Sequence, residues 1–308
     1  MMARGRYDPV ALTVAVTGGD VLPSQSRGIP DNPQAIAADA VKAAAAGATC
    51  IHIHGREQDG RPTGSGAIIK EIIEAIRAQC DVVINLTTGG SVDLSVEERL
   101  EGISEAQPEI ATLNVASMTI ESFPDSSRFP DVKHDWEREV LDASGHNVFK
   151  NTLAMVRDFA AAMKESSVTP EIEAYDMGHI GVTRLLLDEG TLEPPIRVQL
   201  VLGVLGGADS SLETLVAMKG AVERTLGPDV VVGVASMGFP TQFRGAAVAL
   251  GLGLDFRVGV EDNLRIERDR KAVSNAEYVD KARLLAHALA RPIQTPDELR
   301  ANLGPWHS

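Results

Sequence analysis

The most constraining feature of this sequence is a regular alternation of short apolar runs with longer amphipathic stretches. Valine, isoleucine and leucine dominate the short runs, which indicates buried strands, and the longer stretches have apolar residues at helical spacing. The expected strands span residues 10–18, 48–54, 82–87, 109–115, 170–175, 197–203, 229–235 and 254–260. The expected helices span residues 33–47, 66–79, 95–104, 147–164, 177–189, 211–226, 240–252, 275–290 and 295–303.

Eight strands that alternate with helices over about 290 residues predict an α/β protein with the (β/α)8 architecture of a TIM barrel. A doubly wound open sheet is the alternative. No G-x-G-x-x-G follows the first expected strand and the sequence contains no P-loop, so nothing indicates a dinucleotide or a nucleoside triphosphate. We expect a single domain over residues 1–308, with an insertion at about 117–145 after the fourth strand, where the sequence is least regular.

Two histidines end the second expected strand, in the run Ile51-His52-Ile53-His54. Because side chains alternate between the two faces of a strand, His52 and His54 point to the same side. Two imidazoles on one face, followed by a glycine and a polar loop, form most of a metal site. A pair of hydrogen-bonded core histidines is the alternative, because a bare H-x-H is a weak signal.

The barrel topology adds a carboxylate to these histidines. Active sites of (β/α)8 barrels lie at the C-terminal ends of the strands, and closure makes strands eight, one and two neighbours. Glu261, at the end of the eighth strand, can therefore reach the space in front of His52 and His54. Two histidines and one carboxylate suit a catalytic divalent metal, zinc first. Asp262 is the alternative carboxylate ligand, because it directly follows Glu261.

Arg257 lies four residues before Glu261 on the eighth expected strand, so both side chains lie on the same face of the strand. An arginine that points into a barrel must be paired. Glu173, on the fifth expected strand, and Asp262 are the available partners. The group is either a structural ion pair of the core or an arrangement in which the arginine orients a carboxylate base.

Small polar residues at other strand ends are candidate substrate contacts. Thr87 and Thr88, followed by Gly89, offer hydroxyls and exposed backbone N–H groups that suit a substrate carboxylate, and a simple turn is the alternative. The further candidates are Asp20 after the first strand and Thr112 and Asn114 on the fourth.

Composition limits the partners. The net charge of −14 argues against a nucleic-acid binder, and the 4% content of aromatic residues argues against a platform for stacking bases. No apolar window is long enough to cross a membrane, and the first ten residues lack the apolar core of a signal peptide. We therefore expect a cytoplasmic protein that acts on small molecules, with no nucleic-acid or membrane partner.

Taken together, the motifs resemble those of the β-keto acid cleavage enzymes, the family that includes 3-keto-5-aminohexanoate cleavage enzyme. The resemblance extends from Thr13 to about Leu303. The segments that carry it are IHIHGREQDGRPTG, INLTTGG, ATLNVASM, PEIEAYDMG, QLVLGVLGG, RVGVEDN and SNAEYV.

The resemblance implies a (β/α)8 barrel that holds one zinc ion per chain and forms a homotetramer. It also implies roles for individual residues. The implied metal ligands are His52, His54 and Glu261, the implied acid–base group is Asp262, Arg257 and Glu173, and the implied substrate contacts are Asp20, Thr87 and Thr112.

The implied reaction joins a β-keto acid with acetyl-CoA and gives acetoacetate and a new acyl-CoA. The metal would act as a Lewis acid on the keto acid. Asp262 is the base expected to remove a proton from C2, after which the enolate attacks acetyl-CoA and the released thiolate cleaves the adduct. The start of a helix at Ser210 and Ser211 is the expected place for part of CoA, because helix N-termini bind phosphate.

Two positions depart from the family pattern. Asp20 stands where the family has a glutamate, and Gly233-Val-Ala-Ser236 stands where many members have Gly-Ile-Gly-Arg, so an arginine contact is absent. These departures leave a metal-dependent lyase or hydrolase that works without CoA as the alternative function. A non-catalytic ligand-binding barrel is a further alternative, against which the complete set of site residues argues.

Overall fold

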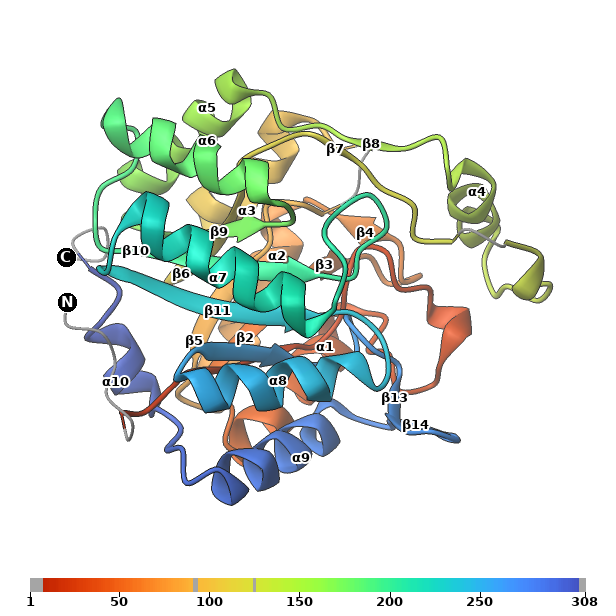
Figure 1. The fold of residues 1–308 in the computed structure, drawn as a ribbon. Helices are drawn as coiled ribbons and strands as arrows, with labels where there is room; N and C mark the ends of the chain where they lie inside the picture. The colour runs from red at the N-terminus through yellow and green to blue at the C-terminus, as the bar shows by residue number, and fades with distance from the viewer. Residues whose placement is uncertain (1–7, 91–93, 124–125, 305–308) are drawn as a thin grey trace.

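The computed structural model describes residues 8–90, 94–123 and 126–304, so most of the segment examined for a signal peptide lies outside the described residues. Within these ranges, eight parallel strands close into a barrel that is surrounded by helices (Figure 1). The expected (β/α)8 fold is confirmed, and the open sheet is excluded. The barrel strands are β1 (Leu12–Ala15), β2 (Cys50–Ile53), β5 (Val83–Leu86), β6 (Ile110–Asn114), β9 (Thr169–Ala174), β10 (Ile196–Leu202), β11 (Val230–Ser236) and β12 (Asp255–Val258).

Polar side chains cap several of the helices at their first turn. Asn32 accepts a hydrogen bond from the backbone of Ala35 and so opens the first long helix, which ends at Gly47 in a left-handed conformation. The helices are α1 (Pro33–Ala46), α2 (Gly66–Arg77), α3 (Val96–Ala106), α5 (Leu153–Glu165), α6 (Met177–Asp188), α7 (Leu212–Leu226), α8 (Thr241–Leu252), α9 (Asn275–Ala288) and α10 (Pro296–Arg300).

One expected helix, residues 147–164, starts six residues too early. Val148–Phe149 forms the short strand β8, which pairs with β7 (Met118–Thr119). The helix begins only after Thr152, whose side chain accepts a hydrogen bond from the backbone of Met155. The cap at Thr152 and the pairing of β8 therefore override the apolar pattern that made 147–164 look like one continuous helix.

The barrel interior changes from apolar to polar along its axis. At the N-terminal end of the strands, Leu299 and Leu303 pack with inward side chains such as Cys50 and close the barrel. One layer further on, Arg197 pairs with Asp255 at 2.8 Å and with Glu171 at 3.5 Å, and all three side chains are buried. The main apolar core lies outside the barrel, between the strands and the helices. A buried charge must be paired, so these ion pairs fix the layer beneath the C-terminal end.

The insertion predicted at 117–145 contains β7, a 3₁₀ turn η2 (Ser126–Arg128) and a helix α4 (Asp135–Ala143), and α4 lies apart from the barrel helices (Figure 1). It packs on the loop after β1 through an apolar cluster that includes Leu22, Phe123 and Trp136. The buried Glu137 accepts hydrogen bonds from the backbone and hydroxyl of Ser24 at 2.8 and 2.6 Å. The insertion is thereby tied to the end of the barrel that holds the site; the single-domain assignment stays a prediction.

Two hairpins at the C-terminal end of the barrel had no signal in the sequence. They pair β3 (Gly55–Arg56) with β4 (Pro62–Thr63) and β13 (Arg265–Glu267) with β14 (Arg270–Lys271). Strands of two or three residues are too short for an alternation of side chains to be recognised. In the part of the chain that the structure describes, no helix is long and apolar enough to cross a membrane.

Arg56 fixes the loop that follows β1. Its guanidinium is fully buried and donates to the hydroxyl of Thr17 at 2.9 Å and to the carbonyls of Gly60 and Val21, each at 2.6 Å, as well as to that of Gly18. Burial lowers the pKa of Arg56 to about 10, which still leaves it charged at neutral pH. A single cation therefore holds the loop after β1, which borders the site, against the turn between β3 and β4.

We predict that Arg56→Met lowers the free energy of unfolding by about 3 kcal/mol, because several buried carbonyls lose their charged donor. Arg61→Met is the matched control: Arg61 is half exposed and only reaches Glu139 at 3.7 Å, so its loss should change the free energy by less than about 0.5 kcal/mol. Urea denaturation followed by circular dichroism measures both values. Equal effects of the two substitutions would show that Arg56 does not fix the loops.

Candidate active site

A cavity of about 580 Å³ opens at the C-terminal end of the barrel strands. Its walls come from the strand ends, the loop after β1 and the insertion. This is the end at which barrels carry active sites. Of the residues singled out in the sequence, those that line it are Asp20, His52, His54, Thr87, Gly89, Asn114, Glu173, Arg257, Glu261 and Asp262.

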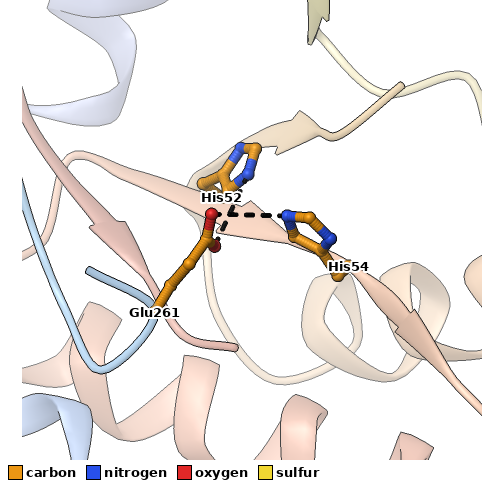
Figure 2. Close-up of side chains that lie close together, drawn as sticks. All are labelled: His52, His54 and Glu261. Atoms are coloured by element: carbon orange, nitrogen blue, oxygen red, sulfur yellow. Dashed lines mark ion pairs between the residues drawn. The ribbon is translucent and has the colours of Figure 1, made fainter. Parts of the chain in front are cut away.

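His52, His54 and Glu261 point toward one another (Figure 2). A carboxylate oxygen of Glu261 lies 3.7 Å from Nε2 of His52, and the other lies 3.4 Å from Nε2 of His54. One potential ligand atom from each residue lies within 4.8 Å of the others. Tetrahedral zinc with bonds of about 2.0–2.1 Å holds its ligand atoms about 3.3 Å apart, so the three side chains fit the ion after small adjustments.

Unsatisfied buried atoms point to the same conclusion. Oε2 of Glu261 and Nδ1 of His54 are buried and have no hydrogen-bond partner among the described residues. Buried polar atoms in folded proteins are normally satisfied. A cation beside Glu261 would satisfy Oε2, so this donor set is able to hold a divalent metal.

The orientation of the His52 ring is set by Asn85, a residue that lies outside the cavity wall. Its Nδ1 lies 3.2 Å from Oδ1 of Asn85, and Nδ2 of Asn85 donates to Glu171 at 2.6 Å. Because the amide of Asn85 uses its N–H group on Glu171, its oxygen faces the imidazole and must accept from Nδ1. Nε2 of His52 therefore carries the lone pair, and this atom faces Glu261. Burial also lowers the pKa of His52 to about 3, so the ring is neutral, as a metal ligand must be.

Arg257 gathers three carboxylates beside the histidines. It donates to Asp262 from Nε at 3.0 Å and from Nη2 at 2.7 Å, and to Glu261 at 2.5 Å, while Glu173 lies 3.6 Å away. Asp262 uses both oxygens on Arg257, whereas Glu261 uses only Oε1 there and keeps Oε2, which is unpaired among the described residues, beside His52. This division favours Glu261 over Asp262 as the metal ligand.

The carboxylates differ in their ionisation. Burial raises the pKa of Glu173 to about 7, since Arg257 offsets only part of the cost of desolvation. Burial also raises the pKa of Asp262, again against the effect of Arg257. In Glu261, the attraction of Arg257, His54 and His52 outweighs burial and lowers the pKa. One arginine cannot balance three carboxylates, so the cavity has an excess of negative charge that a divalent cation would neutralise.

The remaining predicted substrate contacts divide into two groups. Asn114 is buried, lines the cavity and has both amide atoms unpaired among the described residues, so it is free to bond a substrate. Asp20 also lines the cavity, where it accepts a hydrogen bond from Ser122 of the insertion at 2.6 Å. Thr88 and Thr112 lie behind the wall instead, where the hydroxyl of Thr88 donates to the carbonyl of Thr112 at 2.7 Å and joins β5 to β6.

The backbone N–H groups of the Thr-Thr-Gly-Gly turn are not exposed in the way that the sequence suggested. The backbone N–H of Gly89 donates to the hydroxyl of Thr87 at 2.9 Å, and that of Gly90 does so at 3.4 Å. These amides are therefore used inside the turn and are not free for a substrate carboxylate. The simple turn that was the alternative explains them, although Thr87 and Gly89 still form part of the cavity wall.

Two further residues of the site were not singled out from the sequence. Asn85 lies two residues before Thr87 on the same strand, and Tyr175 lies two residues after Glu173, so the alternation of side chains would have placed both inside the barrel. The hydroxyl of Tyr175 donates to Glu173 at 3.3 Å. The insertion also contributes Ile120 and Phe123 to the cavity, and no pattern in the sequence indicates this.

Known proteins are similar to this chain over almost its whole length. A family model described as beta-keto acid cleavage enzyme matches residues 9–304. A 3,5-dioxohexanoate:acetyl-CoA acetone transferase of Paraburkholderia graminis is 39% identical over 295 residues, which make up 96% of this chain and 95% of that protein. A 3-keto-5-aminohexanoate cleavage enzyme of Acetoanaerobium sticklandii is 32% identical over 298 residues, or 96% of this chain and 98% of that protein.

A solved structure of ObcA in a binary complex with oxaloacetate is similar in fold. It matches with a TM-score of 0.68 over 90% of this chain and 67% of that chain, at 18% sequence identity. At this identity the likeness supports the barrel fold alone.

We predict that Asn85→Leu weakens zinc binding about 10- to 100-fold, because His52 loses the acceptor that keeps its Nε2 lone pair toward Glu261. Competition with a chromophoric chelator measures the dissociation constant. Gln294→Leu is the control, since it removes a buried side-chain amide near the N-terminal end of β1, where the backbone N–H of Gln294 donates to the carbonyl of Val10, and should leave zinc affinity unchanged. Equal affinities of the wild type and Asn85→Leu would contradict the role of Asn85.

Proposed function

The chain belongs to the beta-keto acid cleavage enzyme family, and we propose that it is a zinc-dependent acyltransferase that converts a β-keto acid and acetyl-CoA into acetoacetate and a new acyl-CoA. The use of acetyl-CoA is supported by the name of the Paraburkholderia graminis relative, an acetyl-CoA acetone transferase. The observation that carries the proposal is the position of Glu261, which has one oxygen on Arg257 and faces both histidines inside the cavity.

His52, His54 and Glu261 would hold the zinc. When bound there, the ion supplies a Lewis acid that polarises the keto group of the substrate and makes the protons on C2 more acidic. Asp262 is the base in this proposal, and the two hydrogen bonds from Arg257 fix its carboxylate in the cavity wall. Glu173 lies 3.6 Å from Nη1 of Arg257 and is itself held by the hydroxyl of Tyr175, so both ends of the guanidinium have a carboxylate neighbour.

In the proposed reaction, each bond that forms is matched by one that breaks. Asp262 takes a proton from C2, and the resulting carbanion attacks the carbonyl carbon of acetyl-CoA, which expels the CoA thiolate. The thiolate then attacks the original keto carbon, C3, and the C2–C3 bond breaks. The electron pair of that bond returns to C2, where the proton held by Asp262 completes acetoacetate, and C3 leaves as the thioester carbonyl of the new acyl-CoA.

The proposed substrate contacts that remain on the cavity wall are Asp20, Thr87, Gly89 and Asn114. The homotetramer and the cytoplasmic location also stay predictions. Support for an oligomer comes from apolar side chains that are 42–54% exposed on the neighbouring helices α6 and α7, because exposed apolar surface of this kind often marks a contact between proteins. These side chains are Met177, Leu185, Leu212 and Val216.

We predict that the purified enzyme contains about one zinc per chain and forms a new acyl-CoA with at least one member of a panel of β-keto acids. The His52→Ala variant should lose both properties, because two ligands hold a catalytic zinc poorly. His287→Ala is the matched control, since His287 is exposed on α9 and should leave zinc content and turnover unchanged. Metal analysis and mass spectrometry of the products give the two readouts.

The Asp262→Asn variant separates the base from the metal site in the same assay. Its zinc content should be that of the wild type, whereas turnover should fall about 10²- to 10⁴-fold, the usual contribution of a general base. A product that forms from the keto acid without acetyl-CoA would instead favour a lyase. Absence of zinc from the wild type would overturn the metal site itself.

A further inference from the structure

Acetyl-CoA has to be held at two distant places, and this inference rests on its use as the co-substrate proposed above. Its thioester must reach the base and the metal ligands inside the cavity. Its adenosine carries a diphosphate and a 3′-phosphate at the far end of a long pantetheine arm. The phosphates must therefore remain at the rim, where cationic side chains would have to bind them.

The cavity offers few cations for this purpose. Among the described residues that line it, the positively charged side chains are Arg257 and Arg265. Arg257 is buried and fully occupied by Glu261, Asp262 and Glu173. Arg265 is exposed, and the hydrogen bond that its guanidinium makes within the described residues goes to the carbonyl of Arg268, at 3.0 Å. Arg265 is thus the lining cation that remains available to an anion.

The position of Arg265 is fixed by its neighbours. Oδ1 of Asn263 accepts from the backbone N–H of Arg265 at 2.9 Å, and Nδ2 of Asn263 donates to its carbonyl at 2.7 Å. The hydroxyl of Tyr278 in turn donates to the carbonyl of Asn263. The base of the β13–β14 hairpin is therefore anchored directly after Asp262, so Arg265 has a constant place at the exposed rim of the cavity.

Arg268 extends the positive charge along the same hairpin. It is exposed, and no partner of its guanidinium is found in the described ranges. The other two cations of the hairpin are engaged, because Arg270 pairs with Glu277 at 2.5 Å and Lys271 donates to the carbonyl of Gln25. On a chain with a net charge of −14, Arg265 in the cavity wall and the exposed Arg268 on the same hairpin create a local site for an anion.

The start of α7, where the sequence suggested part of CoA, is less suitable. The carboxylate of Asp209 accepts from the backbone of Ser211 at 2.7 Å, and the hydroxyl of Ser211 accepts from the backbone of Thr214 at 3.2 Å. These amides are already used, and the carboxylate would repel a phosphate. We propose that Arg265 and Arg268 on the β13–β14 hairpin bind the adenosine phosphates of acetyl-CoA, while the thioester lies inside the cavity.

The first test is the binding of CoA and of 3′-dephospho-CoA, measured by isothermal titration calorimetry on the wild type and on Arg265→Gln. We expect the dissociation constant for CoA to rise about tenfold in Arg265→Gln, as the loss of one charge-assisted hydrogen bond predicts, and further in Arg265→Gln/Arg268→Gln. Binding of CoA to the wild type should also weaken with salt, because exposed charges are screened. Arg283→Gln is the control: Arg283 is exposed on α9, donates to the carbonyl of Ala46 at the end of α1, and lies outside the cavity wall.

Steady-state kinetics separates this inference from the proposed function. In the two hairpin variants, the KM for acetyl-CoA should rise more than the KM for acetyl-pantetheine, which lacks the phosphates. If the wild type turns over but CoA binds equally to wild type and variants, the hairpin is not the phosphate site and the proposed function stands. If the wild type neither binds CoA nor forms acyl-CoA, the proposed function fails and this inference fails with it.

Discussion

The arrangement of the site depends on one buried cation, the guanidinium of Arg257. It lies inside the barrel, where an unpaired charge would be prohibitively costly, and so it draws Asp262, Glu261 and Glu173 together. Three carboxylates around one arginine leave an excess of negative charge, and the carboxylate of Glu261 lies between Arg257 and the two histidines. The same interaction thus fixes the proposed base, Asp262, and orients the proposed metal ligand, Glu261.

The barrel tolerates this concentration of charge because its stability comes from the apolar core outside the barrel. The apolar core fills the space between strands and helices, so the interior of the barrel can be polar without loss of the fold. Beneath the site, Arg197 with Asp255 and Glu171 forms a second buried network, and Asn85 connects it to His52. The orientation of the proposed metal ligand His52 is therefore set by residues that lie outside the cavity wall.

The sequence was sufficient to predict the features that depend on a regular repeat of side chains along a strand or helix. Alternation along the strands correctly placed His52, Glu173 and Arg257 on the inner face, and closure of the barrel brought Glu261 to the histidines. It did not indicate that the amides of the Thr-Thr-Gly-Gly turn bond their own Thr87, because such local bonds leave no periodic trace. The hairpin at Arg265 and the packing of the insertion depend on contacts between distant residues, and very short strands carry too little pattern to reveal them.

Anomalous diffraction at the zinc absorption edge, from crystals grown with one equivalent of zinc, tests the central claim most directly. We predict a strong peak within bonding distance of His52, His54 and Glu261, with Asp262 still paired to Arg257. A peak bonded to Asp262 in place of Glu261 would reverse the assignment of ligand and base. The absence of a peak between the histidines, in crystals that hold zinc elsewhere, would contradict the metal site and the chemistry derived from it.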